Sequence, residues 1–95
     1  MEGWLSCKIS PGQFTGEFAV RSKMFDATEF SLFAPKEDLR FDKEPTEKNS
    51  EIGSMRVSFV QEEDDLIMVM LPRPTFENGR MVTVKREQVN LEGSR

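Results

Sequence analysis

Residues 14–20, FTGEFAV, place large apolar side chains at nearly every second position. Phe14, Phe18 and Val20 share one side of this segment with Gly16, and the intervening residues are mostly polar. Because successive side chains of a β-strand point to opposite faces of a sheet, this alternation predicts a strand with one buried face. The same two-residue period elsewhere in the chain decides the fold class.

Five further segments carry the alternation or an uninterrupted apolar run. They are residues 5–9, 29–34, 55–59, 66–71 and 81–84. The run at 66–71 is apolar on both faces, which predicts that this strand is the most buried and that Met68 and Met70 pack in the core. No stretch of eleven residues carries a helical stripe. We therefore expect an all-β fold of five to six antiparallel strands, with short 3₁₀ turns at 36–38 and 85–88.

A chain of 95 residues is expected to form one small domain. Residues 42–54, DKEPTEKNSEIGS, contain Ile52 as their only large apolar side chain. Such a stretch cannot offset its ordering entropy by burial, so we predict a mobile loop there. We expect a turn at Asn78-Gly79 and a disordered tail at 92–95.

Two segments of the chain resemble each other. Residues 32–41 and 82–91 each read as a strand, a charged one-turn bend, and two apolar residues separated by one polar residue. Two strands that end in the same kind of 3₁₀ corner would explain the pattern. An ancient duplication of half the chain is the alternative.

Residues 79–91, GRMVTVKREQVNL, resemble the closing segment of SH3-like small barrels. In that family a strand runs into a 3₁₀ turn and then into a short strand whose valine plugs the barrel. The resemblance implies a small SH3-like barrel, and closure would remove exposed sheet edges. Because the chain has no tyrosine and a single tryptophan, we do not expect an aromatic groove for polyproline ligands.

The composition excludes several kinds of enzyme. Histidine is absent, which removes Ser-His-Asp and Cys-His catalytic groups and His-ligated zinc. The one cysteine, Cys7, shares a strand face with Leu5 and Ile9, so we expect it to be buried rather than a nucleophile. The acidic run Glu62–Asp65 lacks the alternate ligand spacing and the glycine of calcium loops, so we interpret it as a solvated turn. No cofactor or metal is expected.

Net charge and the N-terminal residues bear on partners and compartment. The formal net charge is −4, and residues 37–65 carry ten acids against four bases. This balance argues against the whole molecule being a nucleic-acid binder. Residues 1–8 have neither a basic lead nor an apolar run, so no signal peptide is expected. We expect a soluble cytoplasmic protein, in keeping with the single unpaired cysteine.

These exclusions favour a non-catalytic module that binds another protein or a second copy of itself. Its candidate contact residues are Trp4, Arg73, Phe76 and Arg80, because residues 72–76 combine prolines with an arginine and an aromatic. The alternative for Phe76 is that it folds back to cap one end of the barrel.

Two other functions remain as alternatives. The first is RNA or single-stranded DNA binding through the basic C-terminal cluster, Arg73, Arg80, Lys85 and Arg86. The second is a small thiol or acid–base enzyme, which would need a cleft that holds Cys7 or two converging carboxylates.

Overall fold

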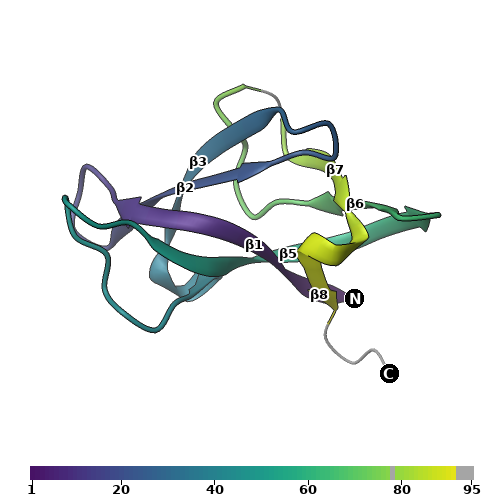
Figure 1. Cartoon of the computed structure of the whole chain (residues 1–95). Coiled ribbons are helices and arrows are strands. Elements are labelled where there is room, and N and C mark those ends of the chain that lie inside the picture. Colours follow the sequence, from purple (N-terminus) through teal and green to yellow (C-terminus); the bar gives the residue numbers. More distant parts are fainter. Residues whose placement is uncertain (78, 92–95) are drawn as a thin grey trace.

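The computed structural model describes residues 1–77 and 79–91 and is all-β, as the two-residue period predicts (Figure 1). Asn78 of the expected turn and the expected tail at 92–95 lie outside the described residues. The strands are β1 (Glu2–Pro11), β2 (Glu17–Lys23), β3 (Glu29–Pro35), β4 (Leu39–Arg40), β5 (Glu51–Glu63), β6 (Leu66–Met70), β7 (Met81–Lys85) and β8 (Val89–Leu91). Two 3₁₀ turns, η1 (Lys36–Asp38) and η2 (Arg86–Gln88), confirm the predicted corners.

The strands form one antiparallel sheet that curls into a half-barrel around the long central pair β1 and β5. The main path through the sheet is β3-β2-β1-β5-β6-β7. The short strand β4 pairs with β5, and the short strand β8 pairs with β1. Each central strand therefore pairs with strands of both halves of the chain, which makes the two halves structurally interdependent.

The two halves of the chain are related by a pseudo-twofold axis. Leu5 of β1 pairs with Met55 of β5, and these residues also pair with Val89 of β8 and Leu39 of β4, respectively. Residues 50 positions apart thus occupy equivalent places on either side of the Leu5–Met55 pair. The equivalence extends beyond the repeated segments seen in the sequence to the central strands, which favours duplication over a shared corner alone.

Each of two loops forms a backbone hydrogen bond to an end strand of the half-barrel. The Phe25 amide, between β2 and β3, donates to the Thr83 carbonyl of β7 at 3.0 Å. The Phe76 amide, between β6 and β7, donates to the Ser31 carbonyl of β3 at 3.0 Å. β3 and β7 are the end strands of the sheet, so each loop occupies a backbone acceptor at the edge of the opposite half.

The core lies on the concave face of the sheet and confirms several predicted positions. Leu5, Cys7 and Ile9 of β1 are all buried. The prediction for residues 66–71 is wrong in part, because Ile67, Val69 and Leu71 are buried whereas Met68 is half-buried and Met70 is 37% exposed. The half-barrel has one layer, so only one face of β6 is covered and both methionines point outward.

Two expected strand boundaries are also corrected. Phe14 is 71% exposed and lies in the turn before β2, not on its buried face. Gly16, at a φ of 83°, belongs to the same turn, although the alternation placed it within the strand. β5 begins at Glu51, inside the predicted loop 42–54, because its first residues pair with β1. Backbone pairing extends this strand where side-chain burial gives no signal.

Candidate functional site

The loop between β6 and β7 carries three of the predicted contact residues and is held at its base by one of them. The Arg80 Nε donates to the Leu71 carbonyl at 3.1 Å, and one of its terminal nitrogens donates to the Pro72 carbonyl at 3.4 Å. The Leu71 amide in turn donates to the Arg80 carbonyl at 2.7 Å. Arg80 therefore positions the loop with its guanidinium.

Phe76 projects from this loop and is 66% exposed, so it does not fold back into the barrel. Its ring stands edge-on to the Phe33 ring of β3, with 5.2 Å between centroids and an interplanar angle of 86°. The Phe76 amide and the Glu77 carboxylate both bond to Ser31 of β3. The aromatic ring is thus exposed on a tethered segment, an arrangement that limits the entropy lost on binding.

Arg73 lies beside this aromatic pair. It lines a hollow of about 150 Å³ together with Phe33, Pro35 and Glu17. The Oε1 atom of Glu17 is buried and has no hydrogen-bond partner among the described residues. We name the surface formed by Phe33, Phe76, Arg73 and Pro35 the aromatic corner.

Phe33 and Pro35 are the residues of this corner that the sequence analysis did not identify, and Phe33 is the aromatic one. It stands at an alternate position in residues 29–34, between the buried Leu32 and Ala34, so the period places it on the outer face. Only its juxtaposition with Phe76, more than forty positions later, makes it part of a binding surface.

Trp4 lies away from the aromatic corner, and its side chain is 7% exposed. The Arg40 guanidinium lies over the indole ring at 3.8 Å from its centroid, and that of Arg56 lies at 5.3 Å. Arg56 is further held by Glu2 at 3.1 Å and Asp38 at 3.9 Å. Trp4 is therefore a covered side chain that joins β1 to β4 and β5 by cation–π contacts.

The four bases of the C-terminal cluster are divided between the two ends of β7. Arg80 precedes the strand and Lys85 ends it, a span of about 17 Å at the rise of a β-strand. Arg86 pairs with Glu62 at 2.9 Å and donates to the Val89 carbonyl at 3.0 Å. The four bases lie within fourteen residues of sequence, but the structure separates them into a pair near the aromatic corner and a pair near η2.

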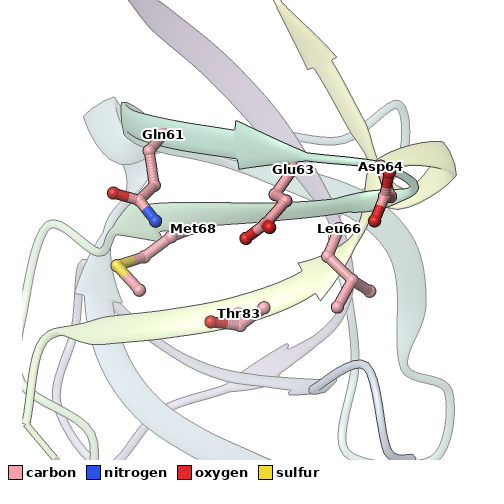
Figure 2. Close-up of a pocket in the computed structure, with 6 residues that line it drawn as sticks. All are labelled: Gln61, Glu63, Asp64, Leu66, Met68 and Thr83. Carbon is pink, nitrogen blue, oxygen red and sulfur yellow. The ribbon is translucent and has the colours of Figure 1, made fainter.

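A second hollow, of about 200 Å³, lies on the outer face of β5, β6 and β7 (Figure 2). Leu66 and Met68 form its apolar floor, Gln61 and Glu63 project over it from β5, and Thr83 lies on the β7 side. The acidic run is not a single turn, since β5 continues to Glu63 and only Asp64 and Asp65 connect it to β6. Among residues 1–77 and 79–91, no three acidic or thiol groups are arranged to hold a metal ion.

The thiol of Cys7 is buried on the inner face of β1. Burial disfavours the charged thiolate and raises the pKa of the Cys7 thiol to about 12. At neutral pH the group is protonated and has low nucleophilicity. The prediction that Cys7 packs as a small apolar residue is confirmed by its burial.

No helix in the described part of the chain has the length and apolar character needed to cross a bilayer. Comparison of the chain with protein-family models, curated proteins and solved structures gives no match.

Proposed function

We propose that this protein is a non-catalytic interaction module that recognises another protein through the aromatic corner. The observation that carries the proposal is the exposed Phe76 ring, fixed on Phe33 by a loop that is tied to β3 and closed by Arg80. Exposed aromatic and arginine side chains on rigid segments are the residues that dominate binding energy at protein interfaces. Arg73 supplies the neighbouring positive charge.

The proposal of a non-catalytic role draws on the side-chain chemistry of the chain. The sequence has no histidine, and its one thiol is protonated at neutral pH. Glu17 has the orphaned carboxylate oxygen of the described residues, and it lies in the hollow beside Arg73 and Phe33. Glu17 is the only carboxylate among the described residues that line this hollow, whereas acid–base chemistry generally uses a second group.

We also propose that the fold is SH3-like. Support comes from the segment that carried the resemblance, in which β7 leads through η2 into β8. Val89, the residue at the position of the barrel-plugging valine, is buried and pairs with Leu5 of β1. The proposed contact surface lies on a loop and an edge strand, and so differs from a polyproline groove.

Substitution of the aromatic corner tests the function. Cells that express the protein are crosslinked, and partners captured by the wild type are compared with those captured by Phe76→Ala, Arg73→Glu and the control Phe25→Ala. Phe25 is also a partly exposed phenylalanine of a connecting turn, but it lies outside the corner. We expect each of the first two variants to capture at least tenfold less of the specific partners than the wild type, and the control to capture as much as the wild type. All variants should keep the wild-type melting temperature.

Equal capture by wild type and Phe76→Ala would overturn the proposal. The nucleic-acid alternative is tested on the same proteins by gel retardation of single-stranded RNA and DNA at ~50 mM salt, where phosphate contacts are strongest. Retardation that disappears in Lys85→Glu and Arg86→Glu, with partner capture unaffected, would favour that alternative.

A further inference from the structure

The outer face of β1, β2 and β3 carries a row of positive charge next to the aromatic corner. Lys8 of β1 pairs in register with Arg21 of β2, and Arg21 pairs with Ser31 of β3. Both Lys8 and Arg21 are exposed. Cβ atoms directly opposite each other on antiparallel strands are about 5 Å apart, so the two cations are neighbours.

Like charges in this arrangement destabilise a sheet. Within residues 1–77 and 79–91, no ion pair links Lys8 or Arg21 to a carboxylate. Two acidic residues near this pair have other neighbours. Glu77 bonds to Ser31 at the edge of β3, and Glu29 lies opposite Lys23 in the register of β2 and β3. An anion bound between Lys8 and Arg21 would relieve their repulsion.

The next row of residues on the same face has small side chains on β1 and β2 and ends at Phe33 of the aromatic pair. Ser10 of β1 pairs with Ala19 of β2, and Ala19 pairs with Phe33 of β3. Ser10 and Ala19 are small, so no large side chain of this row stands between β1 and the paired rings of Phe33 and Phe76. Successive rows are two residues apart along a strand, or about 7 Å.

We infer that the partner of this module presents an extended acidic segment, in which a carboxylate binds between Lys8 and Arg21 and an apolar side chain packs against Phe33 and Phe76. From the midpoint between Lys8 and Arg21, the Phe33 position lies one row along the strands and one and a half strands across, or about 10 Å away. The segment recognised therefore carries an acidic residue and an apolar residue that are two or three positions apart in an extended peptide. This inference rests on the proposed function and adds the chemical class of the partner.

The charge distribution favours an acidic peptide over a polyphosphate. The site offers two neighbouring cations, enough for one or two carboxylates, whereas nucleic-acid binding draws on many phosphate contacts. Glu17 and Glu77 flank the aromatic pair and would repel a continuous phosphate backbone. The pseudo-twofold equivalent of Lys8 is Ser58, which pairs with Met70, so the other half lacks the cationic row.

The test measures fluorescence anisotropy of three labelled nine-residue peptides with the full chain. One contains Glu-Gly-Phe repeats, the second has Gln in place of Glu, and the third has Lys in place of Glu. We expect the Glu peptide to bind at least tenfold more tightly than the Gln peptide, and the Lys peptide to bind least. The double variant Lys8→Gln/Arg21→Gln should lower binding of the Glu peptide at least fivefold, and Lys8→Glu/Arg21→Glu at least tenfold.

The matched control is Lys43→Glu/Lys48→Glu, which makes the same change in net charge at two exposed residues of the loop before β5. We expect it to bind the Glu peptide within twofold of wild type. Equal binding of the Glu and Gln peptides, or equal losses in the control and the Lys8/Arg21 variants, would overturn the inference. Tighter binding of a twelve-nucleotide oligouridine, lost in the same Lys8/Arg21 variants, would also overturn it in favour of nucleic acid.

The inference and the proposed function fail in different ways. If Phe76→Ala loses the cellular partners but the Glu peptide does not bind, the acidic class is wrong and the aromatic corner remains the contact surface. If Phe76→Ala keeps the cellular partners, the proposed function itself is wrong.

Discussion

Gly53 of β5 lies where the backbone of β4 approaches most closely to it. It lies in β5, where Cys7 of β1 is its register partner and Arg40 of β4 pairs with the adjacent residue. A Cβ atom at this position would collide with the Arg40 carbonyl and would come within 2.7 Å of the Ile9 Cδ1. No side chain fits without movement of the β4 backbone, so glycine is required by space and not by its φ angle.

We predict that Gly53→Ala lowers the free energy of unfolding by about 1–3 kcal/mol, the range for overpacking of a closely packed site. Urea denaturation with an unchanged m-value would measure the loss. Gly79→Ala is the control, because a Cβ at Gly79 meets nothing within 4 Å. A Gly53→Ala protein as stable as the control would contradict the close approach of β4.

At the scale of the element, the Glu77 side chain reports whether the loop between β6 and β7 is bonded to the edge strand β3. Glu77 accepts the Ser31 amide at 2.9 Å and the Ser31 hydroxyl at 3.0 Å. The bond from the Ser31 backbone lowers the pKa of the Glu77 carboxyl from its ordinary 4.5, because it stabilises the ionised form. A depressed pKa in the folded state means that the contact is complete above pH 4.5 and is lost as the pH falls through the folded value.

We therefore expect the Ser31 amide proton to titrate in NMR spectra with a midpoint below 4.5, as the carboxylate that it bonds becomes protonated. Glu77→Gln keeps an acceptor of similar shape and should abolish this titration. Aromatic signals of Phe76 should shift with the same midpoint, because the neighbouring residue anchors its loop. A midpoint at or above 4.5 would show that the loop does not rest on the β3 edge in solution.

At the scale of the whole molecule, the pseudo-twofold relation couples the two halves. β4 of the first half pairs with β5, and β8 of the second half pairs with β1, so each half completes the sheet of the other. Leu39 and Val89 are the equivalent buried residues of these two short strands. Loss of either contact removes packing from both halves.

We predict a single cooperative unfolding transition for the full chain. Trp4 fluorescence, a probe of the first half, should coincide with far-UV circular dichroism, which follows both halves. Leu39→Ala should shift both curves together by about 2–5 kcal/mol, the usual range for truncation of a buried leucine. Two separated transitions would mean that the halves fold independently and that the crossed strands contribute little.

The sequence alone determined the fold class, because the period of the side-chain pattern depends only on local backbone geometry. Alternation predicts all-β structure and places Leu5, Cys7 and Ile9 on one face, where all three are buried. These properties are local, since a strand's two faces are defined by the strand itself. They could be derived from the residues without knowledge of the partners of each strand.

Only the tertiary structure decided which faces are covered and which distant residues meet. Met70 and Trp4 are both apolar residues of strands. The curl of a single layer leaves Met70 exposed, whereas Trp4 is covered by the guanidinium groups of two arginines. The meeting of Phe33 with Phe76 depends on a loop bonded to a strand from the other half. Such contacts depend on long-range register and sheet curvature, which no local period encodes.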